Sequence, residues 1–169
     1  MRFTAIGLGC IVTFLDLLTK WIIRNTELLH NYTVIEGFFS IHYVRNEGIA
    51  FGLFHESESQ WKPIILAVLA IVALMVVLYY IWTTPLDEQA MSLCLGLLLG
   101  GILGNFIERL MRQHVTDFIE VHWRELYSWP TFNVADSAIT CGVLVILFQT
   151  FFGKHEGQLE DTKNPAAND

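Results

Sequence analysis

The stretch IILAVLAIVALMVVLYYIW, residues 64–82, is apolar at all 19 positions and decides the class of the fold. About 20 apolar residues in a helix cross the hydrocarbon core of a bilayer. A helix on the surface of a soluble bundle has a polar face, and this stretch has none. It therefore predicts a transmembrane helix.

Three more stretches have the length of a transmembrane helix, and 53% of all residues are apolar. These stretches are residues 3–23, 89–107 and 134–152. Tryptophan side chains favour the headgroup level of a membrane. Those at the ends of the stretches are Trp21, Trp61 and Trp82. We therefore expect an α-helical integral membrane protein with four transmembrane helices.

Two large loops and a tail make up the rest of the chain. The first loop, residues 24–63, is rich in β-branched and aromatic residues around a turn at Glu36 and Gly37, which predicts a small extramembrane antiparallel sheet. Its phenylalanines suit a sheet that lies on the membrane or covers a substrate groove; they are Phe38, Phe39, Phe51 and Phe54. The second loop, residues 108–133, is polar. We expect one domain over residues 1–153 and a disordered polar tail over residues 154–169.

Several function classes are disfavoured by composition and motifs. The formal net charge of −7 offers no basic stripe for phosphates, so we expect no nucleic-acid partner. Cys10, Cys94 and Cys141 all fall in predicted helices without a CxxC pair and are expected to behave as small apolar residues. The sequence contains neither HExxH nor GxSxG, which argues against zinc and serine hydrolases. We expect no metal and no cofactor.

Two aspartates lie where apolar helices meet water: Asp117 in VTDFIEVH and Asp136 in FNVADSAIT. A carboxylate beside hydrocarbon is costly unless it is paired, protonated or in a wet cavity, so both are candidate functional residues. Adjacent carboxylates share a proton and can act as general base and general acid in peptide hydrolysis. Taken singly, Asp136 is equally an acidic residue in the first turn of a helix, and Asp117 a solvated loop charge.

Further polar residues flank these aspartates. Asn105 and Arg109 share one helical face, and Asn133 precedes Asp136 by three residues. Together with Asn46 in the first loop, they can hold a peptide backbone through amide and guanidinium donors. Each asparagine alone is also typical of a helix cap or a turn.

Residues at four-residue spacing mark two of the helices. In the first, Asp16, Lys20 and Arg24 share one face. They form either an ion pair whose basic members reach for the interface, or a structural support of the site. In the third helix, small residues at this spacing predict close helix packing without chemistry. They are Gly96, Gly100 and Gly104.

Five motifs together resemble lipoprotein signal peptidase, or signal peptidase II, the bacterial intramembrane aspartic peptidase. They are DLLTK (16–20), NEGIAFG (46–52), GGILGNFIER (100–109), VTDFIEVH (115–122) and FNVADSAI (132–139). They occur in order, with family-like spacing, over nearly the whole chain except the tail. The resemblance implies an enzyme that removes signal peptides from prolipoproteins by cutting before the cysteine that carries a diacylglyceryl group.

The same resemblance implies roles for single residues. Asp117 and Asp136 become the catalytic dyad. The positions implied to support the site or to contact substrate are Asp16, Lys20, Asn46, Gly48, Asn105, Arg109, Asn133 and Ala135. The third-helix motif commonly ends in Asp-Arg in this family, whereas here it ends in Glu108-Arg109. We expect Glu108 to serve if this carboxylate orients its neighbours, and activity to be altered if it must keep a fixed distance.

The resemblance also implies a location and partners. It places the protein in the bacterial inner membrane, with cytoplasmic termini and the active site toward the periplasm. Diacylglyceryl-prolipoprotein and membrane lipids are the expected partners of a monomer. The count of basic residues favours the opposite orientation, because more of them flank the two large loops than the termini. A rival function is a small carrier or channel subunit in which Asp16 and Asp136 bind a cation or relay protons.

Overall fold

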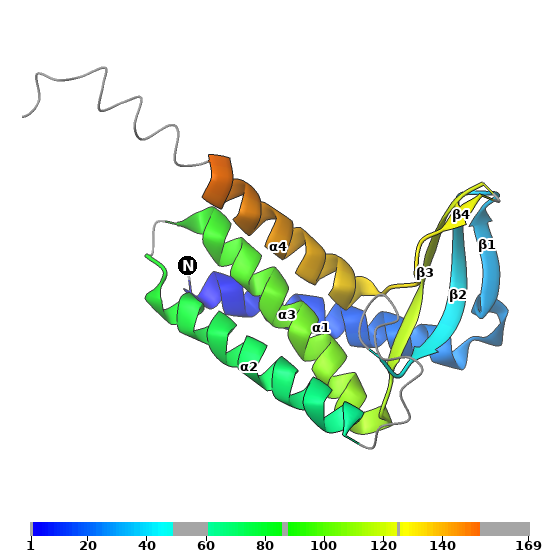
Figure 1. The fold of residues 1–169 in the computed structure, drawn as a ribbon, viewed down its shortest axis with the longest axis horizontal. Helices are drawn as coiled ribbons and strands as arrows, with labels where there is room; N and C mark the ends of the chain where they lie inside the picture. Colours follow the sequence, from blue (N-terminus) through cyan, green and yellow to red (C-terminus); the bar gives the residue numbers. More distant parts are fainter. Residues whose placement is uncertain (1, 49–60, 86–87, 125, 153–169) are drawn as a thin grey trace, which may run out of the picture.

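The computed structural model describes residues 2–48, 61–85, 88–124 and 126–152, in which four long helices form a bundle with a small sheet at one end (Figure 1). The helices are α1 Arg2–Asn25, α2 Lys62–Thr83, α3 Gln89–Arg112 and α4 Val134–Phe152. Each is long and apolar enough to cross a membrane, which confirms the four predicted helices. The predicted tail and two loop phenylalanines, Phe51 and Phe54, lie outside the described residues.

Helix α3 is the centre of the bundle and packs against the other three helices. Its glycines permit this packing because their neighbours leave no room for a side chain. A Cβ atom at Gly100 would lie 2.6 Å from the Gly9 carbonyl oxygen of α1, and one at Gly101 would lie 2.5 Å from the Ala135 carbonyl oxygen of α4. The predicted close helix packing is therefore confirmed.

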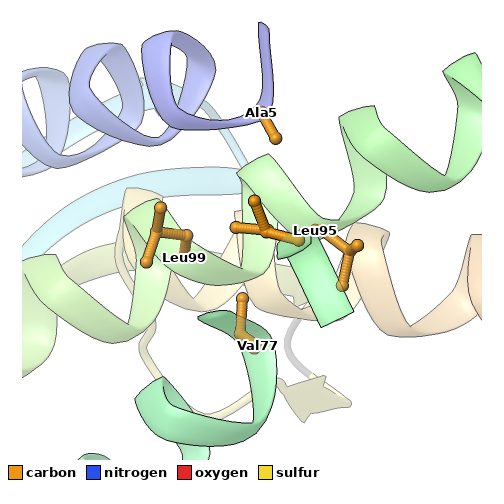
Figure 2. Close-up of a cluster of buried hydrophobic side chains, with 5 residues drawn as sticks. Ala5, Val77, Leu95 and Leu99 are labelled. Carbon is orange, nitrogen blue, oxygen red and sulfur yellow. The ribbon is translucent and has the colours of Figure 1, made fainter. Parts of the chain in front are cut away.

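A small apolar core holds α1, α2 and α3 together (Figure 2). Its members are Ala5, Val77, Ile81, Leu95 and Leu99. The outward surface is apolar as well, since α2 exposes Val68 and Met75 and α4 exposes Phe148. This inverts the pattern of a soluble bundle and fits a surface in contact with lipid.

The sheet is antiparallel with strand order β1-β2-β3-β4. Its strands are β1 Asn31–Ile35, β2 Phe39–Asn46, β3 Val115–Trp123 and β4 Tyr127–Ser128. The first two strands and their turn at Gly37, where φ is +68°, confirm the sheet predicted in the first loop. Strands β3 and β4 come from the second loop and were not predicted, because the partner of β3 lies more than 60 residues earlier in the chain.

The two faces of this sheet differ in polarity. Residues paired across antiparallel strands lie on the same face. The face that carries Asp117 is mainly apolar apart from Asn46; its pairs are Asn46 with Val115, Val44 with Asp117, Ile41 with Ile119, and Phe39 with Val121. On the opposite face, Glu120 is contacted by Ser40 and Ser128. Figure 1 shows the sheet at the end of the bundle where α4 begins, away from the start of α1.

Candidate active site

The structure brings the two aspartates together through one asparagine. Asp117 is the third residue of β3, and Asp136 is the third residue of α4. Asn133 donates from its side-chain amide to Asp117 Oδ1 at 2.7 Å and from its backbone N–H to Asp136 Oδ2 at 3.3 Å. Asn133 is fully buried, and Asp117 is only 2% exposed. The two carboxyl groups therefore lie together, and Asp117 is not a solvated loop charge.

Asp136 also belongs to the cap of α4. Asn133 Oδ1 accepts the backbone N–H of Asp136 at 2.9 Å, while Asp136 Oδ2 accepts the backbone N–H of Asn133. This reciprocal pair is a capping box. The other oxygen, Asp136 Oδ1, accepts a hydrogen bond from the Asn105 side-chain amide at 2.8 Å. Asn133 and Asp136 thus cap α4 and also lie in the candidate site.

Asn46 combines a turn with a contact to Asp117 in the same way. Its Oδ1 accepts the backbone N–H of Gly48 at 2.9 Å, and its Nδ2 donates to Asp117 Oδ2 at 2.8 Å. Arg109 Nη2 donates to the Gly48 carbonyl oxygen at 3.0 Å and so ties this turn to α3. Asp117 consequently receives one amide donor on each carboxylate oxygen.

The environment of Asp117 raises its pKa to about 7, well above the ordinary value of 3.8. Burial is the largest cause, since it disfavours the charged form, and the neighbouring charge of Asp136 adds to it. The hydrogen bonds from Asn46 and Asn133 act in the opposite direction. A carboxyl group with this pKa can take up or release a proton at neutral pH.

Lys20 points into the bundle instead of reaching for the interface. It is fully buried, and its Nζ lies 2.7 Å from Asp16 Oδ2 and 3.4 Å from Glu108 Oε2. It also donates to Asn105 Oδ1 at 2.7 Å. These oxygens compensate for the loss of water around the ammonium group. The structure therefore contradicts the interpretation that Lys20 reaches for the membrane interface. Its ammonium group lies next to Asp16, and Asn105 connects it to Asp136.

Asp16 connects this lysine to the start of α4. Its Oδ1 accepts the backbone N–H of Ala135 at 2.9 Å, and both residues are buried. Gly104 makes room for the carboxylate, because a Cβ there would lie 2.5 Å from Asp16 Oδ2. This glycine serves the site in addition to helix packing, which the sequence analysis did not foresee.

Glu108 and Thr116 form a contact that the sequence analysis missed. Glu108 Oε2 accepts the backbone N–H of Thr116 at 2.9 Å, and Oε1 accepts its hydroxyl at 2.8 Å. The guanidinium of Arg24 also contacts Glu108. The available signal was spacing, since Glu108 follows Asn105 by three residues and so lies on the same face of α3.

An apolar cavity of about 220 Å³ lies between α2 and α3 beside the site. Apolar side chains of both helices line it, and Arg109 and Gln113 supply polar groups. Within the described ranges, no cluster of three or more His, Cys, Asp or Glu side chains is arranged to hold a metal ion.

Known proteins share both this sequence and this fold. Residues 8–152 match the family described as Signal peptidase (SPase) II. A lipoprotein signal peptidase of Solibacter usitatus is 38% identical over 157 residues, covering 92% of this chain and 95% of its own. One from Francisella tularensis subsp. novicida is 36% identical over 148 residues, covering 87% of this chain and 91% of its own.

Two solved structures described as bacterial membrane enzymes have the same fold. One, determined at 2.3 Å resolution, has a TM-score of 0.75 at 30% identity and covers 98% of this chain and 93% of its own. The other, at 1.9 Å, has a TM-score of 0.76 at 29% identity and covers 88% of this chain and 93% of its own. Family match, relatives and fold agree over nearly the whole chain, and this multi-pass membrane protein therefore belongs to the signal peptidase II family.

Proposed function

We propose that this protein is an aspartic endopeptidase that removes the signal peptide of diacylglyceryl-modified prolipoproteins by cutting before the lipidated cysteine. Membership of the signal peptidase II family supports a peptidase that acts on lipoprotein signal peptides. The observation that carries the aspartic mechanism is the bridge by Asn133, which contacts Asp117 and Asp136 at once. Two carboxyl groups at one place can divide the work of acid and base between them.

The chemistry needs one proton shared by the pair. The ionised carboxylate takes a proton from water, whose oxygen attacks the carbonyl carbon of the scissile peptide bond. The protonated carboxyl group gives its proton to the carbonyl oxygen. In the second step the carboxyl group that took the proton from water gives it to the amine of the lipidated cysteine, and the C–N bond breaks. The other carboxylate takes a proton from a hydroxyl of the tetrahedral intermediate, so that the signal peptide leaves with a new carboxyl group and the pair again holds one proton. The pKa of about 7 at Asp117 suits such exchange at neutral pH.

The position of the pair fits a substrate that is anchored in lipid. A signal-peptide helix and two acyl chains stay in hydrocarbon while one peptide bond must meet water. Asp136 lies in the first turn of α4, and Asp117 lies on the mainly apolar face of the sheet. We propose that this face rests on the membrane surface, which sets the pair at the interface. The apolar cavity beside Arg109 offers space for an aliphatic part of the substrate.

For the location we propose the bacterial inner membrane, with both termini cytoplasmic and the aspartates toward the periplasm. The start of α1 and the end of α4 lie at the end of the bundle opposite the sheet (Figure 1). This supports placing both termini on the same side of the membrane. We also propose that a monomer suffices, because Asp117 and Asp136 both come from one chain. The carrier or channel alternative has no support from the family match.

The test is cleavage of a purified diacylglyceryl-prolipoprotein by the purified protein, with Asp117→Asn and Asp136→Asn assayed separately. Each substitution keeps the shape of the side chain but removes the titratable group, so both variants are expected to lose activity by at least about a thousandfold. Glu120→Gln is the matched control, because Glu120 lies on the same strand as Asp117 but on the opposite face. Near-normal activity in either aspartate variant would refute the dyad.

A further inference from the structure

Each of the two aspartates is preceded by a residue whose backbone N–H is bound by a buried carboxylate. Thr116 precedes Asp117, and its N–H donates to Glu108 Oε2 at 2.9 Å. Ala135 precedes Asp136, and its N–H donates to Asp16 Oδ1 at 2.9 Å. The two attachments start from different helices, α3 and α1, and end on different elements, β3 and α4.

Each of the two carboxylates supplies an acceptor to a peptide N–H that has no partner within its own helix or strand. The first N–H groups of any helix lack an intrahelical acceptor, and Ala135 is the second residue of α4. On β3, Thr116 pairs with Arg45 of β2, while β4 pairs only with His122 and Trp123 farther along the strand. Buried peptide donors need an acceptor, and a carboxylate is a strong one.

One cation joins the two carboxylates. Lys20 Nζ lies 2.7 Å from Asp16 Oδ2 and 3.4 Å from Glu108 Oε2, and all three side chains are at most 2% exposed. The same Nζ donates to Asn105, whose amide donates to Asp136. Lys20 therefore links the carboxylates that bind the backbone before both aspartates.

Stability alone is a weak explanation for this arrangement. A buried ion cluster recovers its desolvation cost only with excellent geometry, and well-packed apolar residues of similar volume often stabilise a protein equally well. An apolar residue, however, cannot accept the N–H groups of Thr116 and Ala135. What the cluster provides uniquely is a set of fixed acceptor oxygens beside the aspartates.

We propose that Glu108 and Asp16, joined by Lys20, are positioning residues that fix the backbone immediately before Asp117 and Asp136 respectively. The inference rests on the proposed function, since it assumes that these two aspartates react with substrate. Glu108 is the more informative of the two, because its two oxygens accept both the N–H and the hydroxyl of Thr116.

The experiment compares Glu108→Gln with Glu108→Asp in the prolipoprotein cleavage assay. Gln keeps the volume of Glu but replaces one acceptor oxygen by a donor, which then faces another donor. Asp loses a methylene group but keeps two acceptor oxygens. If Glu108 positions Asp117, Gln lowers kcat about 10- to 100-fold with little change in KM, as expected for a misplaced reacting group, and Asp retains more activity than Gln.

If Glu108 only fills space, Glu108→Gln is expected to have a higher kcat than Glu108→Asp, because Gln has the volume of Glu. A kcat of Glu108→Gln at or above that of Glu108→Asp would overturn the inference. So would an increase in KM with kcat unchanged, which would assign Glu108 to substrate binding. Glu120→Gln serves as the control for a charge lost on the opposite face of the sheet and is expected to keep wild-type kcat.

Thr116→Val tests the positioning role of Glu108 if Glu108→Gln does not fold. It removes the hydroxyl, which donates to Glu108 Oε1 and accepts a hydrogen bond from Arg24 Nη1 at 3.4 Å, and it keeps the backbone N–H bond to Glu108. A folded Thr116→Val protein is expected to lose about threefold to tenfold in kcat, less than the glutamine variant, and an unchanged kcat would overturn the inference. Asp117→Asn is assayed beside it. Activity in that variant refutes the dyad itself, whereas inactivity together with normal Glu108 variants refutes only the positioning role.

Discussion

Replacing Asp117 by Asn is expected to stabilise the protein at alkaline pH while abolishing catalysis. The pKa of Asp117 is raised from 3.8 to about 7 in the folded protein. A group whose pKa is higher in the folded than in the unfolded state loses stabilising free energy as pH rises between the two values. Above pH 7 the folded protein therefore bears a cost of about 4 kcal/mol, at 1.36 kcal/mol per pKa unit, for keeping this carboxylate charged.

Asparagine removes that cost but also disturbs two hydrogen bonds. Asn46 and Asn133 each donate to one oxygen of Asp117, and the amide that replaces the carboxylate has only one oxygen. One donor is left unpaired, which costs about 1–3 kcal/mol at any pH. The pH dependence isolates the charge effect. Between pH 5 and pH 8 the stability of Asp117→Asn relative to wild type is expected to rise by roughly 2.5 kcal/mol, from the two pH units between 5 and the folded pKa.

The assay is equilibrium unfolding in mixed detergent micelles at pH 5, 6, 7 and 8, with wild type, Asp117→Asn and the control Glu27→Gln. The difference between Asp117→Asn and wild type should grow from pH 5 to pH 7 and then level off. The control should show no such trend, because Glu27 is an exposed residue of the short helix Glu27–Leu29, far from Asp117 in the sequence and outside its contacts. A difference that is constant over this pH range would mean that Asp117 has an ordinary pKa and would refute the reasoning.

Three further results are expected. The kcat/KM for prolipoprotein should fall as pH rises through about 7, because Asp117 then loses the proton that the reaction needs; a flat profile up to pH 9 would contradict this. Asn46→Ala removes a hydrogen bond that lowers the pKa of Asp117, so this alkaline limb should move to higher pH, and a shift to lower pH would contradict the contact. Gly104→Ala places a Cβ 2.5 Å from Asp16 Oδ2 and should cost about 1–3 kcal/mol of unfolding free energy, whereas Gly7→Ala, with nothing within 4 Å, should cost none.

The helices could be predicted from the sequence because membrane spanning depends on local composition. A run such as residues 64–82 is decided by length and hydropathy, and its context adds little. Only the first two strands of the sheet could be predicted from the sequence. The hairpin of β1 and β2 carries its own turn at Gly37, whereas β3 has no local signal for a partner in the first loop. Long-range pairing depends on where α1 and α3 bring the two loops, which periodicity does not report.

The site shows the same division between local and long-range information. Asp117 and Asp136 stood out because a carboxylate beside hydrocarbon is costly, a property visible at each position. The bridge that Asn133 makes between them and the contact of Glu108 with Thr116 came only with the structure, since each depends on contacts across elements. The asparagines were ambiguous in the sequence for a physical reason. An amide has an acceptor and two donors, so Asn46 and Asn133 each form a local turn or cap and still donate to Asp117.

This use of amides explains how the site combines fixed geometry with a pKa near neutrality. The side chains that touch the oxygens of Asp117 belong to Asn46 and Asn133, which carry no charge. A cation in either place would hold the oxygen equally well but would favour the carboxylate strongly, and the pKa of Asp117 would fall far below 7. The buried ammonium of Lys20 is instead paired with Asp16 and separated from Asp136 by Asn105. Neutral donors therefore contact the oxygens of Asp117, and the charged groups Glu108 and Asp16 bind the backbone one residue before each aspartate, an arrangement that leaves the pKa of Asp117 near 7.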